Sequence, residues 1–321
     1  PIFIEPGEVV MGHPASRPRA AEVFPEVNMK FMEDLDTFET REYNRLRVTD
    51  DVRKTLHDIQ PFWRGKTLTE LFAELRHPLA RNGVEAGLTS NSHEWSGFAH
   101  VSMDYRKLLS RGIEGMREEI EERLANLAFT DPEYGPKSSF YRACLEVCEG
   151  MLILANRYRE LALDLARRED DPDRRSELES MAARLERVPL HPARTFREAV
   201  QSFWFMQVVP QIESNGYSIT PGRFDQYMWP YLEKDLAEGA ITTDEAQELV
   251  DMLFLKFCEI MRVDSYTSAE INAGYASGQN LVVGGVGPDG EDATNPLSYM
   301  CLLANYHVQL NQPNFTVRLH R

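Results

Sequence analysis

The residue types best suited to acid–base chemistry gather in one short stretch, residues 91–105. It contains His93, His100 and Asp104, with Trp95 among them, directly before a segment of helical character. Histidine exchanges protons near neutral pH, so one of these imidazoles could protonate or hydrogen-bond a substrate. A histidine at a helix entrance can equally be a structural hydrogen-bonding residue, and both interpretations stay open here.

A second polar stretch, Glu-Ser-Asn-Gly-Tyr-Ser at residues 213–218, follows an almost wholly apolar segment. Small polar groups that emerge from a buried segment need partners, and a substrate hydroxyl or carboxylate could supply them. The Asn-Gly pair is also typical of an ordinary turn. Substrate binding and turn formation are therefore both open for this stretch.

Common catalytic and metal-binding signatures are missing from the sequence. The His93-Glu94 pair has no second histidine at the spacing that zinc proteases use. The glycines after residue 283 precede a turn and not a helix, which argues against a dinucleotide or phosphate loop. Cys144 and Cys148 share one helical face without histidines beside them, so core packing is favoured over metal binding. The sequence thus predicts no metal site.

The composition is that of a globular protein with an acidic surface. The 321 residues are 42% hydrophobic, and 35 basic against 51 acidic side chains give a net charge of −16. Such a surface repels phosphate backbones and anionic lipids, which argues against a nucleic acid partner. No apolar run approaches the roughly 20 residues that span a bilayer, and no signal peptide is visible. We therefore expect no membrane partner. The four cysteines lie in apolar helical contexts, which predicts reduced thiols and a cytoplasmic protein.

Helical patterns position both polar stretches. Apolar residues recur at helical intervals in eight segments, and capping-box spacing begins several of them, as at Thr67 with Glu70 and Thr242 with Glu245. The first segment should stop before Pro61, and the sixth is apolar on nearly all sides, which predicts burial. The expected helices are residues 49–59, 68–75, 105–127, 138–168, 174–188, 196–208, 224–236 and 245–262.

A different pattern begins after residue 273. Residues 279–285 and 315–319 read as two strands, joined by a helix at residues 295–310 that begins with Asn-Pro. Such a βαβ unit has parallel strands and a right-handed crossover. A parallel pair needs further strands, so either an earlier segment such as residues 8–11 supplies one or the domain is unfinished. We favour one continuous, unfinished domain.

Eight blocks of the sequence carry a family resemblance, among them Ala-His-Val-Ser-Met-Asp-Tyr at residues 99–105 and Ile-Glu-Ser-Asn-Gly-Tyr-Ser-Ile at residues 212–219. The full set is residues 61–67, 99–108, 155–158, 196–205, 212–228, 279–285, 292–295 and 298–300. In order and spacing they resemble the amino-terminal half of the glycyl-radical enzymes. The most similar group is the glycerol and diol dehydratase, choline lyase and decarboxylase group of the pyruvate formate-lyase-like family.

This resemblance implies an α/β fold class, part of a ten-stranded α/β barrel that is mostly helical in this portion. It also implies a glycyl radical, installed by a radical-SAM activating enzyme, that oxidises a cysteine to a thiyl. The thiyl takes hydrogen from a small-molecule substrate, and a neighbouring C–O, C–N or C–C bond breaks. Such a site must be buried, because water, oxygen and stray hydrogen donors quench radicals.

The two radical-bearing loops of the family have no counterpart in residues 1–321. The Cys-Val-Glu motif of the thiyl loop does not occur, and no cysteine lies in a matching motif. We therefore expect residues 1–321 to be the N-terminal portion of a single pyruvate formate-lyase-like domain, truncated at both ends and inactive alone. The glycyl radical would lie on the missing C-terminal part, with no cofactor bound directly to this portion.

Residue roles carry over only where the motifs match. His100 matches a substrate-contacting histidine, which suits it to proton delivery to a leaving hydroxyl, and Ser218 matches a serine that hydrogen-bonds substrate. Ser92 stands where the glycerol enzyme has an asparagine. Gly278 stands where relatives carry a large aromatic side chain, which implies about a ring's volume of extra space. The candidate site is therefore catalytic His100 with Ser218, Ser92 and Gly278 as substrate-binding positions, and a substrate bulkier than glycerol is favoured.

Two further positions bear on the substrate. Tyr217 replaces the histidine usual in this group and should reshape the same wall. Neither Ser92 nor Ser96 is an arginine, whereas sulfonate-cleaving relatives place polar anchors there, so the resemblance disfavours isethionate.

Two functional hypotheses follow. The first is part of a glycyl-radical lyase, of dehydratase or decarboxylase type, within a longer parent protein. The second is a non-catalytic helical scaffold or remnant of the same family. The substrate, the cleaved bond and the oligomeric state stay open, with a homodimer among the assemblies considered.

Overall fold

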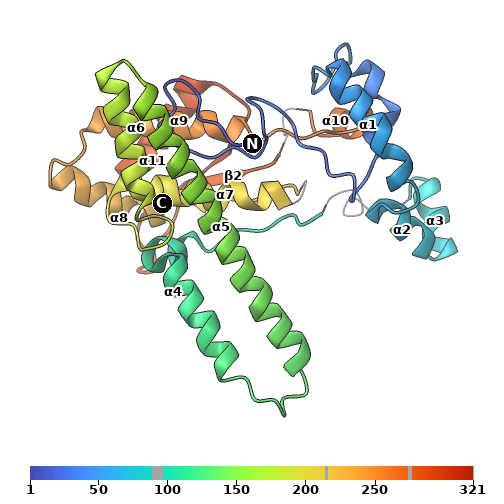
Figure 1. Cartoon of the computed structure of the whole chain (residues 1–321), viewed down its shortest axis with the longest axis horizontal. Helices are drawn as coiled ribbons and strands as arrows, with labels where there is room; N and C mark the ends of the chain where they lie inside the picture. The colour runs from blue at the N-terminus through green and yellow to red at the C-terminus, as the bar shows by residue number, and fades with distance from the viewer. Residues whose placement is uncertain (89–96, 214–215, 274–276, 321) are drawn as a thin grey trace.

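The computed structural model describes residues 1–88, 97–213, 216–273 and 277–320, and it is mostly helical with one small sheet (Figure 1). Two short 3-10 turns, Lys30–Glu33 and Leu35–Thr37, precede the first long helix. The α-helices are α1 (Asp50–Trp63), α2 (Leu68–Leu75), α3 (Pro78–Glu85), α4 (Tyr105–Ala125), α5 (Tyr134–Arg168), α6 (Pro172–Leu185), α7 (Phe196–Glu213), α8 (Phe224–Ala237), α9 (Thr243–Cys258), α10 (Tyr266–Ile271) and α11 (Pro296–Val308).

The described strands form one parallel sheet in the order β1-β2-β3. They are β1 (Gly222–Arg223), β2 (Asn280–Gly284) and β3 (Asn314–Arg318), with Leu281 paired to Phe315 on one side. The expected βαβ unit is confirmed, because α11 connects β2 to β3. Residues 8–11 form no strand, so that suggestion was wrong. The additional strand is β1, whose two residues are too few to show an alternating pattern.

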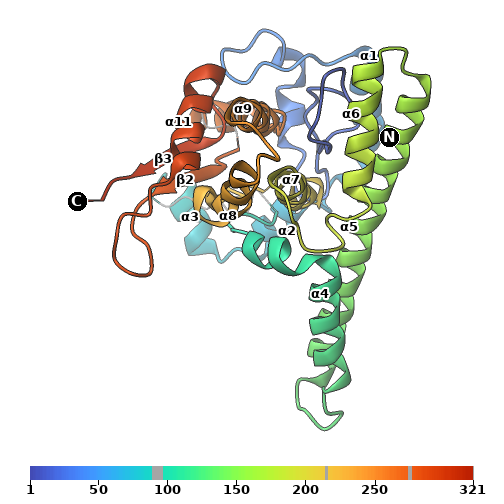
Figure 2. The ribbon, with the colours of Figure 1, turned by 90° about the vertical axis from the view of Figure 1, so that its left-hand side faces the viewer.

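The core lies around α7, as its apolar sequence predicts. Phe203, Trp204 and Phe205 have no exposed surface, and α7 packs against α8 and α4. Figure 2 shows α8, α9 and α11 next to β2, which agrees with the packing of α8 and α11 on that strand. Buried Asp225 joins the sheet to this layer, because its Oδ2 accepts hydrogen bonds from the Gly284 N–H (2.7 Å) and the Ser298 hydroxyl (2.6 Å).

Helix ends follow local chemistry closely. The capping boxes of Thr67 with Glu70 and Thr242 with Glu245 are both formed, and α2 and α9 begin immediately after them. The prediction that the first helix stops before Pro61 was wrong, because α1 continues to Trp63. Proline removes one backbone donor, and only the last residues of α1 follow it, so the cost is confined to the end of the helix.

Other boundaries shift where tertiary contacts dominate. Helix α5 begins at Tyr134, four residues before its expected start, and α9 ends at Cys258 and not at residue 262. The chain leaves the helix there because Arg262 forms a backbone bridge with Glu22. The short helices α3 and α10 were missed, since α3 contains few apolar residues and a glycine, and the six residues of α10 carry little periodicity.

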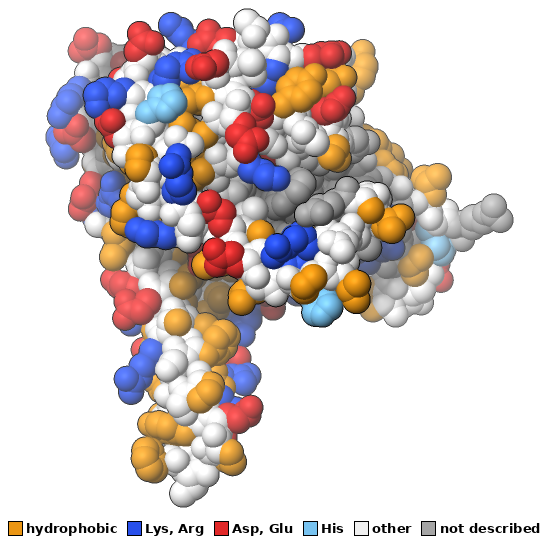
Figure 3. All heavy atoms as spheres, turned by 90° about the vertical axis from the view of Figure 1, so that its right-hand side faces the viewer, with side chains coloured by type: hydrophobic (Ala, Val, Ile, Leu, Met, Phe, Trp, Pro, Cys, Tyr) orange, Lys and Arg blue, Asp and Glu red, His pale blue; other side chains and the backbone are white. Residues whose placement is uncertain are grey.

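Helices α4 and α5 form an arm that projects from the body of the molecule (Figures 1 and 3). At its base Gly112 has φ 66° and interrupts the helical geometry of α4, and a Cβ there would lie 2.3 Å from the Leu190 carbonyl oxygen. Apolar side chains gather at the far end of the arm, where Phe129 is 84% exposed and Phe140 64% exposed. Along its flank Glu119 pairs with three cations, which are Lys107, Arg111 and Arg123.

Within the described ranges, no helix combines the length and the apolar character needed to cross a lipid bilayer.

Candidate functional site

Three segments that are distant in sequence meet at the predicted site. The His100 N–H donates to the Tyr217 carbonyl (2.7 Å), and the Ser218 N–H donates to the Ser277 carbonyl (2.8 Å). An isolated parallel bridge pairs the two residues that follow His100 and Ser218. His100 and Ser218 therefore stand opposite each other, and Gly278 lies against Ser218.

All three of these candidate positions have a left-handed backbone. The φ angles are 55° at His100, 58° at Ser218 and 64° at Gly278. Positive φ is uncommon for residues other than glycine and persists only where the surrounding structure enforces it. Such outliers cluster at functional sites, so this crossing is a candidate site on conformational grounds as well.

The crossing is also unusually close. A Cβ built on Gly216 would lie 1.6 Å from the Phe98 carbonyl oxygen, so only glycine allows these two segments to approach. Ser214 and Asn215 of this polar stretch lie outside the described residues, and Gly216 brings its described part against the segment that carries His100.

Replacing Gly278 by alanine should destabilise the chain by about 1–2 kcal/mol, the cost of a left-handed residue with a side chain. The added Cβ would also lie 2.7 Å from Ser218 Oγ, so the serine hydroxyl must move. Urea unfolding measures the change. The control is Gly150→Ala inside α5, where a Cβ meets nothing within 4 Å and the helix should gain about 0.5–1 kcal/mol. Equal effects in the two variants would contradict the strain at Gly278.

A buried pair of glutamines supports the crossing from below. Gln207 Nε2 donates to the Ile219 carbonyl and to Gln279 Oε1, each at 2.9 Å, while the Tyr105 hydroxyl donates to Gln207 Oε1. Both glutamines are fully buried. Because buried amides must be satisfied, this pair fixes α7 against the start of β2.

Gln279 reaches two further segments. Its Nε2 donates to the Phe257 carbonyl (3.0 Å) and to Ser277 Oγ (2.9 Å), and its carbonyl oxygen accepts from the Asn314 N–H (2.8 Å). The Gln279 side chain thus connects the end of α9 to the segment before β2, and its backbone carbonyl connects to the start of β3. Sequence reasoning missed Gln207 and Gln279, although a glutamine inside the apolar run of α7 is a signal that could have drawn attention to it.

Several predicted positions fall outside the described residues. These are Ser92, His93, Trp95 and Ser96, which all belong to residues 89–96. The structure brings together His100, Ser218 and Gly278.

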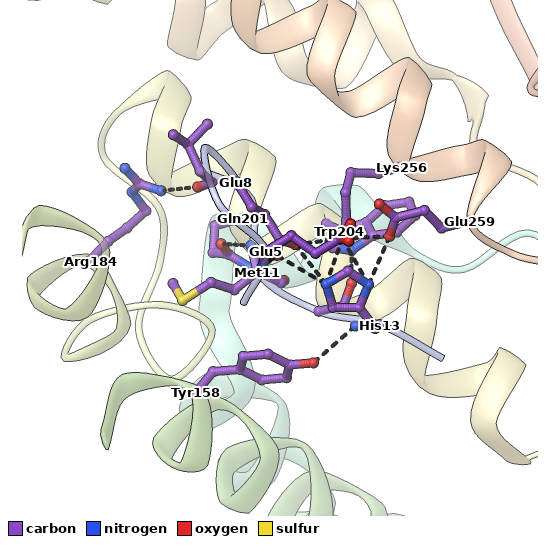
Figure 4. A network of polar contacts seen from close by, with 12 residues as sticks. Glu5, Glu8, Met11, His13, Tyr158, Arg184, Gln201, Trp204, Lys256 and Glu259 are labelled. Atoms are coloured by element: carbon purple, nitrogen blue, oxygen red, sulfur yellow. Dashed lines mark hydrogen bonds and ion pairs between the residues drawn. The ribbon is translucent and has the colours of Figure 1, made fainter. Parts of the chain in front are cut away.

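A second buried polar cluster lies under the N-terminal segment (Figure 4). Lys256 Nζ lies 2.6 Å from Glu8 Oε1 and 2.7 Å from Glu259 Oε2, and it also faces the Trp204 ring of α7 at 5.6 Å. Both ring nitrogens of His13 face carboxylates, with Glu8 at 3.0 Å and Glu259 at 2.9 Å. A neutral imidazole has one N–H, so this arrangement suits the protonated ring.

The environment of His13 sets the direction of its pKa. Burial by itself lowers the pKa, but contacts with Glu259 and Glu8 outweigh both burial and the repulsion of Lys256, so the pKa is raised above 6.5. Phe3 stacks on the ring at 3.9 Å, and the backbone N–H of His13 donates to the Tyr158 hydroxyl. These contacts hold the first thirteen residues against α5 and α9.

The free energy of unfolding should therefore depend on pH through His13. A raised folded-state pKa gives stability that is fully present below the unfolded pKa and is lost as pH rises through the folded pKa. The reference value is 6.5, so the loss should occur above it. Chemical denaturation of the wild type and of His13→Gln, across pH 6 to 9, measures the effect. Parallel pH profiles for the two proteins would contradict this assignment.

The cysteines are packing residues in the described structure. All four thiols are free, and burial raises the pKa of Cys148, Cys258 and Cys301, which keeps them protonated. Among the residues that the structure places, no group of three or more His, Cys, Asp and Glu side chains could hold a metal ion.

Comparisons with known proteins identify the fold. A family model described as pyruvate formate lyase-like matches residues 1–321. The chain is 36% identical to isethionate sulfite-lyase of Nitratidesulfovibrio vulgaris, over 99% of this chain and 40% of that protein. The B12-independent glycerol dehydratase from Clostridium butyricum, with glycerol bound, superposes with a TM-score of 0.94 at 37% identity, over 99% of this chain and 40% of that chain.

A glycyl radical enzyme from Archaeoglobus fulgidus superposes with a TM-score of 0.90 at 34% identity, over 99% of this chain and 41% of that chain. The chain thus spans about 40% of the length of the relatives that it matches. The expected partial α/β barrel is confirmed by these likenesses, and the chain belongs to the pyruvate formate lyase-like family of glycyl-radical enzymes.

Proposed function

We propose that this chain is the N-terminal part of a glycyl-radical lyase or dehydratase that cleaves a C–O, C–N or C–C bond of a small polar substrate. The observation that carries the proposal is the apposition of His100 and Ser218 across two strained segments. Relatives with lyase and dehydratase activity, aligned over 99% of the chain, support the reaction class.

His100 supplies the acid–base function in this proposal. Its imidazole donates a hydrogen bond or a proton to the departing group, since hydroxide or an amide ion is a poor leaving group unless protonated. Ser218 binds a substrate hydroxyl or carboxylate and holds the substrate beside His100. Ser92 is proposed as a third polar contact by resemblance.

The radical chemistry belongs to parts of the whole protein beyond these residues. When a glycyl radical is present, it supplies the oxidising equivalent for hydrogen abstraction through a thiyl. Residues 1–321 contribute one wall of the site and the exclusion of water. The partners are a radical-SAM activating enzyme and a second copy of the protein, in the cytoplasm, and the chain alone should be inactive.

For the substrate we propose a molecule larger than glycerol. Gly278 replaces a large side chain of relatives, and Tyr217 replaces a histidine. The glycine has a conformational role as well, because φ at this position is 64°. Isethionate is disfavoured, since serine stands at positions 92 and 96 where sulfonate anchors would be needed.

The test uses the whole protein, prepared anaerobically with its activating enzyme. We expect a glycyl-radical doublet in electron paramagnetic resonance and turnover of at least one diol, amino alcohol, hydroxyproline or arylacetate. No doublet in the activated protein would instead favour the second hypothesis, a non-catalytic scaffold of the family.

A further inference from the structure

The side chain of Tyr217 is fixed by three residues from the stretch that follows α9. Its hydroxyl donates to Asp264 Oδ1 at 2.9 Å and accepts from Asn272 Nδ2 at 3.1 Å. The Arg262 guanidinium carbon lies 3.0 Å from the centre of the tyrosine ring, in a cation–π arrangement. Ring and hydroxyl are therefore both held, the ring by a cation and the hydroxyl by two polar partners.

This cluster is buried, which makes its contacts strong. The side chains of Arg262 and Asp264 are only 6% and 5% exposed, and they lie 4.0 Å apart. Burial raises the pKa of Tyr217 and lowers the pKa of Arg262, so the phenol stays neutral. Arg41 supports Asp264 from the other side, because its Nη1 donates to the Asp264 carbonyl at 2.8 Å.

The ring of Tyr217 is the main contact of the Arg262 guanidinium. Within the described part of the chain, Arg262 Nε and Nη1 are buried without a hydrogen-bond partner. A buried guanidinium with two unpaired nitrogens depends on nearby charge and on π-contact for compensation. The arginine and the tyrosine thus stabilise each other's position.

The backbone of Tyr217 is part of the candidate site itself. Its carbonyl accepts the His100 N–H, and the next residue, Ser218, is anchored to Ser277. Both His100 and Ser218 have positive φ. Because the side chain of Tyr217 is held in place, its backbone is fixed as well. This backbone in turn positions the two strained residues, His100 and Ser218.

We propose that Arg262 and Asp264 are positioning residues that act through Tyr217 to hold His100 and Ser218 in place. The tyrosine transmits their effect to the two residues. The catalytic meaning of this arrangement rests on the proposed function, whereas the mechanical part can be tested in the chain as it stands.

The mechanical test is hydrogen exchange in peptides covering residues 97–105 and 216–223. Tyr217→Phe removes only the hydroxyl, and we expect exchange in both peptides to rise about threefold to tenfold, as loss of a typical hydrogen bond implies. The matched control is Tyr158→Phe, which also loses a buried hydroxyl contact but lies under the N-terminal segment. It should leave both peptides unchanged.

A double-mutant cycle tests whether Asp264 acts through the tyrosine. Asp264→Ala should raise exchange in the same peptides, and adding it to Tyr217→Phe should have little further effect. The proposal would be overturned if the increases in exchange rate caused by the two single substitutions multiplied in the double variant. Unchanged exchange in Tyr217→Phe would also overturn it. If Tyr217→Phe does not fold, Asn272→Ala removes one bond to the same hydroxyl and carries the same expectation.

Turnover by the whole activated protein then separates the two levels. If the positioning and the site are both right, Tyr217→Phe lowers kcat at least fivefold with little change in KM, while Tyr158→Phe does not at equal thermal stability. Faster hydrogen exchange with unchanged turnover would contradict the catalytic role of the candidate site and leave the positioning proposal intact. Unchanged hydrogen exchange would contradict the positioning proposal, whatever the turnover.

Discussion

Replacing Lys256 by methionine is expected to lower the free energy of unfolding by about 3–5 kcal/mol, the usual cost of removing one partner from a buried ion pair. The Lys256 side chain is 5% exposed, and its ammonium group contacts the carboxylates of Glu8 and Glu259 at 2.6 and 2.7 Å. Methionine fills similar space but leaves two acids facing one imidazole. Urea denaturation of the purified chain at pH 7 measures the change.

The matched control for this substitution is Lys54→Met. Lys54 also pairs with an acid, Asp58, but its side chain is 76% exposed. Exposed pairs contribute about 0–1 kcal/mol, so little stability should be lost. Similar losses in the two variants would show that the buried cluster is not what holds the N-terminal segment.

Replacing His100 by alanine in the whole activated protein should lower kcat by about 10²–10⁴-fold, the range of a general acid–base contribution. Ser218→Ala should cost less, about twofold to tenfold, since it removes one neutral hydrogen bond. The glycyl-radical signal should be unchanged in both, because neither residue carries the radical. Steady-state turnover and radical quantification on the same samples measure these effects.

His57→Ala is the control for the histidine substitution. His57 lies on α1, on an exposed part of that helix, and takes no part in the crossing of the three segments. It should retain full activity. Undiminished turnover in both His100→Ala and Ser218→Ala would refute the assignment of this site.

Local chemistry explains how much of the fold the sequence predicts. Helices α2 and α9 begin after Thr67 and Thr242, each of which is followed by a glutamate three residues later. The threonine and the glutamate of each pair lie within four consecutive residues, so the signal is local. Strand β1 was not predictable in this way, because its two residues are defined only by pairing with Leu281 and Val282, some sixty residues later. Pairing between residues so far apart in the chain produces no periodic pattern in the sequence.

The same distinction between local sequence signals and distant contacts applies to the candidate site. Family motifs predict His100 and Ser218 as site residues, and the structure places the two residues opposite each other. Their positive φ angles, and the side-chain amide contacts beneath them, depend on partners that no local pattern connects. The N-terminal segment is a stronger example, since the Met11 N–H donates to Gln201 Oε1, a residue 190 positions later in the sequence.

The left-handed backbone at His100 and Ser218 limits how the candidate site can diversify in evolution. Valine, isoleucine and threonine are strongly disfavoured at positive φ, so neither position can be tuned by branching at Cβ without rebuilding the crossing. Selection for a new substrate is thereby directed to neighbours with ordinary φ. Tyr217 has an ordinary φ, but its side chain holds the peptide between the two segments, so a change there would have to be matched by changes at Arg262 and Asp264.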